Sequence, residues 1–250
     1  MAIDPAQLAD ALSRLTPTQL RWVQGVLRQF QLPYDFKRNP ASDWLTDDVL
    51  KEVGDALRIH HAFSRQPLSK DRFEYAFERA LNQAGIRASL VASRTNRGHD
   101  ITIAGVPVSL KSEAAANIRA DYIHVSKWME LGKGEWVLET LRTSFLEHMK
   151  SYERIFTLRC LTAGATSYEY ELVEIPKALL LEARTCRLEV QEKSRQTPKP
   201  GYGRVNDEHG NLKFALYFDG GTERKLQIKQ IRKRLCIVHA TWAFESLPLQ

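Results

Sequence analysis

The sequence predicts an α/β fold in which a mixed, mostly antiparallel sheet is flanked by helices, with a helical region at the N-terminal end. Two observations predict it. Apolar residues recur at helical spacing in the segments before residue 85, whereas alternating and strand-like runs dominate after residue 98. The 250 residues contain neither an internal repeat nor a clean linker, so we expect a single domain over residues 1–250.

Residues 1–64 are predicted to be the helical N-terminal region. Asp4 and Thr16 are each followed by proline, which combines an N-cap residue with proline at the first helical position. Residues 33–43 are expected to form a connector, after which Thr46 caps a further short helix.

The clearest predicted helix begins at Ser69. Its apolar side chains fall on one stripe: Phe73, Ala76, Phe77, Ala80, Leu81 and Ala84. Gly85 follows as a C-terminal glycine and ends the helix. Glu74 lies about 100° from Phe73 around the helix, at the edge of the stripe, so we expect its carboxylate to face half inward.

Residues 99–113 alternate strictly, and an Ala-Gly dipeptide interrupts the run, which predicts a β-hairpin. A two-residue turn pairs four apolar residues on one face: Ile101, Ile103, Val106 and Val108. On the other face Asp100 opposes Ser109, and Lys111 lies one step diagonal. Glu113 has the same parity as Lys111, so the polar residues gather on one side of the hairpin.

The remaining segments complete the predicted sheet. Residues 126–150 are predicted to be helical around a Gly-Lys-Gly break, and residues 156–163 and 168–175 are predicted strands. Residues 193–211 are rich in Pro, Gly and Lys and are expected to form a loop. Three strand-like runs follow within residues 213–244.

The composition excludes several classes of protein. Apolar residues make up 43% of the chain and charged residues 26%, which is ordinary for a globular protein. No apolar run approaches the ~20 residues of a membrane span. The three cysteines are widely spaced, which excludes a disulfide framework and a zinc ribbon. The first residues lack the parts of a signal peptide, so we expect a cytoplasmic protein.

The positive charge is concentrated in one segment. The net charge of the chain is +6, and residues 193–234 hold eleven Lys and Arg but four acids, a local balance of +7. A localised basic segment indicates a polyanionic partner such as nucleic acid, although a solvated surface can have the same composition.

Glu74, Asp100, Lys111 and Glu113 are the residues that could carry chemistry. Carboxylates supply the hard oxygen ligands that Mg²⁺ takes. Such a metal polarises a phosphodiester and activates water, and a lysine beside it stabilises charge on the phosphate. A solvated hairpin face with an ordinary ion pair has the same spacing, so the pattern alone leaves both interpretations open.

The arrangement resembles the core of the PD-(D/E)xK nuclease superfamily, in which a helix glutamate precedes a hairpin that bears an acid and a lysine. The matching blocks are RFEYAFERALNQAG for the helix, HD for the first acid and SLK for the end of the second strand. Ser109 departs from the pattern, because the family usually has Asp or Glu two residues before the lysine. Glu74 or Glu113 would have to supply the missing charge.

Longer blocks resemble one family of type II restriction endonucleases from about residue 55 to about residue 245. They include ASRTNRGHDITI, YIHVSKWMELGKGEW, YERIFTLR, LVEIPKALLLEA, PKPGYG and LYFDGGTERKLQIK. The resemblance implies a Mg²⁺-dependent homodimer that recognises 5′-CCCGGG-3′ in double-stranded DNA and cleaves it bluntly at the centre. It also implies a cognate cytosine methyltransferase that protects the host. Residues 69–190 would form a catalytic core, and residues 191–250 a basic, strand-rich DNA-binding part.

The resemblance implies roles for the candidate residues. Asp100 and Glu74, with Glu113 or a backbone carbonyl, would hold Mg²⁺, while Lys111 would orient or activate the attacking water. A site of G·C pairs is read best by Arg or Lys bound to guanine O6 and N7. The candidates for DNA contacts are Arg94, Arg97, Lys199, Arg204, Arg224, Lys225 and Lys229. Some of these must only neutralise phosphates, and the sequence does not assign which.

Two other functions remain open at this level. A repair or recombination nuclease of the same fold would recognise DNA structure rather than sequence. A DNA-binding module that has lost catalysis is the second alternative, and Ser109 is its best argument. An enzyme acting on small molecules is disfavoured, because the sequence carries no cofactor motif.

Overall fold

The structure is a computed structural model that describes residues 4–92, 98–115 and 118–247. Its α-helices are α1 (Pro5–Ser13), α2 (Pro17–Gln31), α3 (Asp47–Phe63), α4 (Lys70–Gln83), α5 (Leu138–His148) and α6 (Lys177–Leu181). Its strands are β1 (Tyr34–Arg38), β2 (Ala88–Leu90), β3 (Ile101–Ile103), β4 (Val106–Glu113), β5 (Tyr122–Glu130), β6 (Arg154–Ala163), β7 (Ser167–Glu174), β8 (Arg187–Val190), β9 (Gly201–Asn206), β10 (Leu212–Asp219), β11 (Lys225–Arg232) and β12 (Ile237–Glu245).

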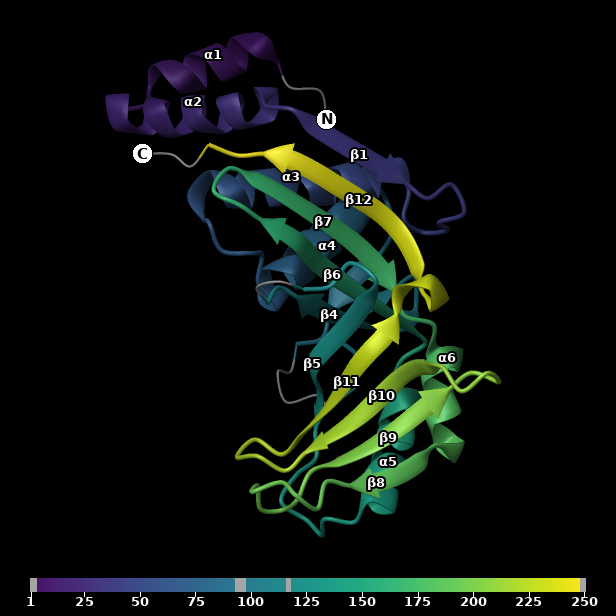
Figure 1. Ribbon diagram of the computed structural model, residues 1–250. Coiled ribbons are helices and arrows are strands. Elements are labelled where there is room, and N and C mark those ends of the chain that lie inside the picture. The colour runs from purple at the N-terminus through teal and green to yellow at the C-terminus, as the bar shows by residue number, and fades with distance from the viewer. Residues whose placement is uncertain (1–3, 93–97, 116–117, 248–250) are drawn as a thin grey trace.

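These strands form two sheets in the described chain (Figure 1). The larger sheet has seven strands in the order β1-β12-β7-β6-β4-β3-β2, and the smaller has five in the order β5-β11-β10-β9-β8. Neighbouring strands are antiparallel except for β4 and β6, which are parallel. The prediction of a mixed, mostly antiparallel sheet architecture with flanking helices is therefore confirmed.

The helix starts follow the predicted capping residues. The side chains of Asp4, Thr16, Thr46 and Ser69 each accept a hydrogen bond from a backbone N–H of the first turn that follows. These bonds satisfy amides that have no partner inside the helix. Helix α3 is longer than the short helix expected after Thr46, because its apolar face continues to pack on the larger sheet.

The hairpin of β3 and β4 has the predicted register. Ile101 pairs with Val108, and Ile103 pairs with Val106. The turn residues Ala104 and Gly105 both have positive φ, at 48° and 86°, which matches the twist that a two-residue hairpin turn requires. The polar residues of the hairpin therefore lie on the face opposite these four apolar residues, as predicted.

Three predictions of local structure are wrong. The expected connector 33–43 contains β1, an edge strand whose hydrogen bonds go to β12 about 200 residues later. The first residues of the expected helix 126–150 belong instead to the end of β5, in which an irregular register opposite β11 places Val125 and Trp128 on one buried face. This three-residue spacing imitates a helix. The expected loop 193–211 contains β9, which pairs with β10 and with the unpredicted β8.

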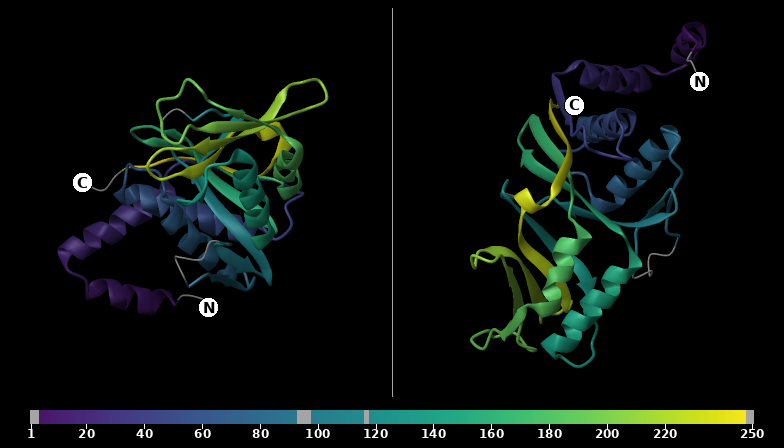
Figure 2. Two further views of the ribbon diagram at one scale, coloured as in Figure 1. Left: turned by 90° about the horizontal axis from the view of Figure 1, so that it is seen from below. Right: turned by 90° about the vertical axis from the view of Figure 1, so that its right-hand side faces the viewer.

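Two apolar clusters hold the molecule together. One lies between the larger sheet and helices α3 and α4, and the other lies among the smaller sheet, α5 and α6. The smaller sheet takes β5 and β8 from within residues 69–190, so the sheets do not divide the chain at residue 191. Helices α1 and α2 project from the body, and α1 buries no residue (Figure 2).

Candidate active site

Helix α4 and the β3–β4 hairpin bring together three of the predicted residues, Glu74, Asp100 and Lys111. The Lys111 Nζ lies 3.9 Å from Asp100 Oδ2. Lys70, which sequence reasoning missed, donates to Glu74 and to Asp100 Oδ1, the latter at 2.7 Å. Its position one helical turn before Glu74 was the signal that could have found it. We call these four residues the Asp100 cluster.

The hairpin fixes the orientation of the Asp100 carboxylate. Its Oδ2 accepts hydrogen bonds from the Ser109 hydroxyl at 3.0 Å and from the Leu110 N–H at 2.7 Å. Ser109 is fully buried. The residue that departs from the family pattern therefore serves as a donor to the first acid, and the second carboxylate near Asp100 comes from Glu74 on α4.

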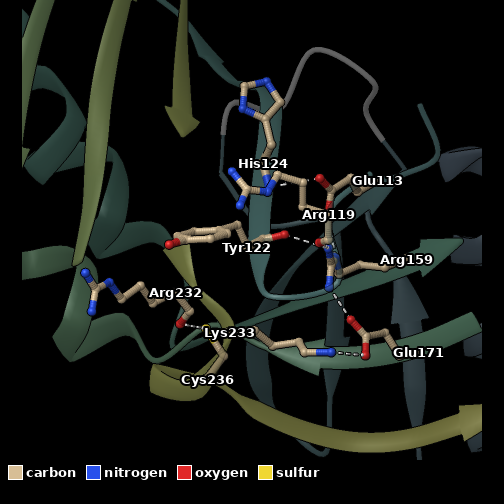
Figure 3. Close-up of polar contacts among 9 residues, drawn as sticks. All are labelled: Glu113, Arg119, Tyr122, His124, Arg159, Glu171, Arg232, Lys233 and Cys236. Atoms are coloured by element: carbon tan, nitrogen blue, oxygen red, sulfur yellow. Dashed lines mark hydrogen bonds and ion pairs between the residues drawn. The ribbon is translucent and has the colours of Figure 1, made fainter. Parts of the chain in front are cut away.

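Glu113 lies in a different cluster. Although it has the parity of Lys111 on β4, both of its carboxylate oxygens are engaged elsewhere (Figure 3). One accepts from the backbone N–H of His124 at 3.0 Å, and the other accepts from Arg159 Nε at 2.5 Å. The structure thus pairs Glu113 with Arg159 of β6 and does not bring it to Asp100 through any contact among the described residues.

Arg159 is the centre of that second cluster, and its side chain is fully buried. It also forms an ion pair with Glu171 of β7, and Lys233 completes the group at 3.0 Å from Glu171. The Arg159 Nη2 donates to the carbonyls of Arg119 and Tyr122, each at 2.7 Å (Figure 3). We call Glu113, Arg159, Glu171 and Lys233 the Arg159 cluster.

The charges of the Asp100 cluster alter one another's protonation. Burial raises the pKa of Asp100, but the Lys111 and Lys70 ammoniums outweigh it and hold that pKa below its usual value. Burial lowers the pKa of Lys70, and the opposing attraction of Asp100 and Glu74 leaves it raised. Burial dominates at Lys111 and lowers its pKa. The pKa values of the two lysines are therefore shifted in opposite directions, because two acids contact Lys70 while burial dominates at Lys111.

Aromatic side chains and a histidine surround Lys111. Its ammonium lies 5.5 Å from the ring centre of Trp128, and the Trp128 indole donates to the Tyr152 hydroxyl at 3.0 Å. His148, at the end of α5, stacks edge-on against Tyr152. Burial, then the Lys111 charge, lower the pKa of His148 to about 4, so this imidazole is neutral near pH 7. The second apolar cluster thus forms the wall behind the lysine.

A cavity of about 420 Å³ opens beside the Asp100 cluster. Lys70, Glu74 and Asp100 line it, together with His99, whose ring is hydrogen-bonded to Thr102 at 3.0 Å. Lys70, Glu74 and Asp100 are therefore reachable from solvent, whereas the Arg159 side chain is fully buried.

The Asp100 cluster suits a hard divalent cation. Among the described residues no group of three or more His, Cys, Asp and Glu side chains could hold a metal ion. Mg²⁺, however, is usually bound by one or two carboxylates, with waters and substrate phosphates completing its shell. Glu74 and Asp100 already share one cation, the Lys70 ammonium, which shows that their oxygens converge on a single positive charge. The residues therefore fit a metal of this kind.

The DNA-binding candidates are distributed over the smaller sheet and its loops. Arg94 and Arg97 lie outside the described residues. The others occupy β9, β11 and adjoining turns, and three of them form ion pairs: Lys199 with Glu192, Arg204 with Glu189, and Lys225 with Glu223. Arg224 donates to the carbonyl of Gly134 at 3.3 Å and lies over Trp136.

Lys229 and Arg204 share the outer face of the smaller sheet. Both pair with Ala215, from opposite sides of β10. Two tyrosines lie between them on this face, and the Lys229 ammonium is 3.5 Å from the ring centre of Tyr217. The Arg204 guanidinium lies 4.8 Å from the ring centre of Tyr202. The inner face, in contrast, is apolar and packs on α5. We call the outer face the basic sheet face.

Comparison with known proteins gives two findings. The family model for SmaI, described as type II site-specific deoxyribonuclease, matches residues 8–244. The curated protein "Type II restriction enzyme SmaI" of Serratia marcescens is 53% identical over 225 residues, which cover 90% of this chain and 89% of that protein. No helix in the described part of the chain is long and apolar enough to cross a membrane.

Proposed function

The chain belongs to the SmaI family of type II site-specific deoxyribonucleases and is a restriction endonuclease, and on that premise we propose that it cleaves 5′-CCCGGG-3′ bluntly at the centre with Mg²⁺. We further propose that it acts as a homodimer, because the two-fold symmetry of a dimer matches that of a palindromic site. We propose that it works in the cytoplasm. A cytosine methyltransferase of the same specificity would protect the host DNA.

The observation that carries the proposed chemistry is the convergence of Glu74 and Asp100 on one cation, with Lys111 beside them. These two carboxylates would hold the metal, and Glu113, whose oxygens are occupied by Arg159 and His124, is left out of the proposed ligand set. When bound, the metal polarises the scissile phosphate and lowers the pKa of the attacking water.

The chain's own residues then have separate tasks. Ser109 and the Leu110 N–H hold the Asp100 carboxylate in one orientation, so that its other oxygen faces the site. Lys111 lies within reach of the same centre and would orient the water or stabilise the charge that develops on the phosphate oxygens. Trp128 and Tyr152 wall the lysine and keep bulk water from its rear side.

We propose that the basic sheet face binds the DNA. Lys229 and Arg204 are presented on a rigid sheet between tyrosine rings, and their side chains reach outward. In this proposal Lys229, which has no acidic partner among the described residues, contacts DNA directly. Three other cations must first exchange an acidic side chain for a phosphate: Lys199, Arg204 and Lys225. Residues 1–250 would act as one nuclease domain.

The testing experiment is a digest of plasmid DNA of known sequence by the purified protein, with Mg²⁺ and with EDTA, followed by sequencing of the ends. We expect discrete fragments with blunt ends at CCC and GGG only when Mg²⁺ is present. Lys111→Ala should lose the cutting, and Lys51→Ala, an exposed helix lysine paired with Asp47, should keep it.

Each other outcome removes a stated part of the proposal. Discrete ends at another sequence would keep the chemistry and discard the recognition site. Smears or nicked circles would favour a structure-directed nuclease and discard specific cleavage. DNA binding without any Mg²⁺-dependent cutting would favour a DNA-binding module without catalysis and reject the proposed active site.

A further inference from the structure

Lys70 occupies the space that a metal ligand set would need. Asp100 Oδ2 is taken by Ser109, by the Leu110 N–H and by the nearby Lys111. The other oxygen, Oδ1, faces Glu74, and the Lys70 ammonium bridges these two carboxylates. A cation held by Glu74 and Asp100 Oδ1 therefore has to take the place of the Lys70 contacts.

The charges of the Asp100 cluster explain why the Lys70 ammonium lies between Glu74 and Asp100. The Asp100 cluster contains two carboxylates and two ammoniums, so it is balanced as it stands. Without Lys70 the carboxylates of Glu74 and Asp100, which are about one-fifth exposed, would face each other with only Lys111 nearby. Like charges in a partly desolvated site disfavour their ionised forms and push the groups apart. A divalent ion added while Lys70 remained would instead leave an excess of positive charge.

Lys70 is also free to leave. Its side chain is 37% exposed, roughly twice the exposure of its two partners, and it lines the cavity of about 420 Å³. Its backbone belongs to the first turn of α4, so only side-chain rotation is needed to release the ammonium to solvent. Lys111, by comparison, is 11% exposed and is walled by Trp128.

We propose that Lys70 is an internal counter-ion that holds Glu74 and Asp100 together in the metal-free enzyme, and that a divalent metal binds by displacing it. The inference rests on the proposed metal site. Lys70 is then a positioning residue that stabilises the metal-free protein. Its ammonium competes with the metal for one oxygen of Glu74 and for Asp100 Oδ1.

The test uses Mn²⁺ as the probe on the full-length, DNA-free protein. Thermal unfolding is measured in EDTA and in saturating Mn²⁺, and Mn²⁺ affinity is measured by calorimetry. The variants are Lys70→Met, Lys70→Arg, Asp100→Asn and Lys51→Met. Lys51 is a matched control, since it too pairs with an acid four residues away on a helix, Asp47, at 3.4 Å. It lies on α3 and is not part of the Asp100 cluster.

We expect Lys70→Met to unfold about 2–4 °C below the wild type in EDTA and to lose that deficit in Mn²⁺. Its Mn²⁺ affinity should rise about tenfold, because a positive charge is removed from between the two ligands. Lys70→Arg keeps the charge and should behave nearly as the wild type. Lys51→Met should change neither the melting temperature difference between the two conditions nor the affinity.

Two results would overturn the inference, and they are distinguishable. If Lys70→Met shows the same deficit in EDTA and in Mn²⁺ with unchanged affinity, Lys70 has only a structural role. The proposed metal site then still stands, provided that Asp100→Asn removes the stabilisation by Mn²⁺. If Mn²⁺ neither binds nor stabilises the wild type or Lys70→Met, the metal site itself is wrong and the inference is rejected with it.

Discussion

The Asp100 cluster and the Arg159 cluster contain the same number of charges but differ in what they leave open. Each holds two carboxylates and two cationic side chains, and β4 contributes to both, through Lys111 and Glu113. The Arg159 guanidinium is fully buried and meets acids and carbonyl oxygens through Nε, Nη1 and Nη2. The Arg159 cluster meets cavities through Glu113 and Lys233, but its central cation is closed off from them. In the Asp100 cluster the cation shared by the two acids, Lys70, itself lines the cavity and is partly exposed.

This difference in exposure of the central cation indicates which cluster can exchange it for a ligand. A buried guanidinium whose three nitrogens all donate to acids or carbonyls is committed to the protein itself, and removing either partner leaves a buried charge unpaired. A cluster with one exposed, exchangeable cation can accept a replacement. Parity on a strand placed Lys111 and Glu113 on the same side, but burial and partners separate a candidate active site from a structural group.

The largest expected effect is on stability, at Arg159. Arg159→Met would leave Glu113 and Glu171 buried with only Lys233 for compensation. We expect the free energy of unfolding to fall by about 3–5 kcal/mol, as when one member of a buried ion pair is removed. Urea unfolding followed by circular dichroism measures it. A loss below about 1 kcal/mol would mean that the Arg159 cluster is open to water and does not differ from the Asp100 cluster in this respect.

The next effect is on catalysis, at Lys111. Lys111→Met should lower the single-turnover cleavage rate by about 10²–10³-fold, since a positioned cation beside the scissile phosphate is lost. DNA affinity in Ca²⁺ should stay within a few-fold of the wild type, because Lys111 is mostly buried and makes no part of the basic sheet face. A rate within tenfold of the wild type would remove Lys111 from the proposed mechanism.

A smaller effect separates the two glutamates. Glu74→Gln should weaken Mn²⁺ binding about tenfold, because one of the two carboxylates that share a cation is neutralised. Glu113→Gln should leave Mn²⁺ affinity unchanged while lowering stability, since its partner is Arg159. Calorimetry of Mn²⁺ binding to both variants measures the two affinities. Weaker Mn²⁺ binding by Glu113→Gln would restore Glu113 as a metal ligand and merge the two clusters functionally.

The smallest effect is a change in the pKa of His148. Burial, then the Lys111 charge, hold this pKa at about 4. Removing a positive charge favours the protonated imidazole, so Lys111→Met should raise the pKa of His148, whereas Glu113→Gln should not move it. Titration of the histidine ring signals by NMR, without metal, measures the shift. An equal shift in both variants would show that the clusters are electrostatically coupled.

Local signals in the sequence were sufficient for the helix starts and for the hairpin. Capping residues and a period-two pattern act within a few residues, and they correctly predicted α4, the β3–β4 register and the nearness of Asp100 to Lys111. The family resemblance was likewise carried by the sequence, and the matched family model and curated relative support it.

What the sequence could not decide depends on contacts between distant segments. Strand β1 exists because β12 supplies its hydrogen bonds, and β5 imitates a helix because its pairing with β11 is irregular. The separation of Glu113 from Asp100 likewise depends on Arg159, which is 46 residues away in the chain. The alternation of the hairpin placed Asp100 and Lys111 on one face, but it did not reveal that Lys70 reaches Asp100 or that Arg159 holds Glu113. Those pairings come from other elements of the fold, because the pairing of buried charges is set by the neighbouring elements that desolvate them.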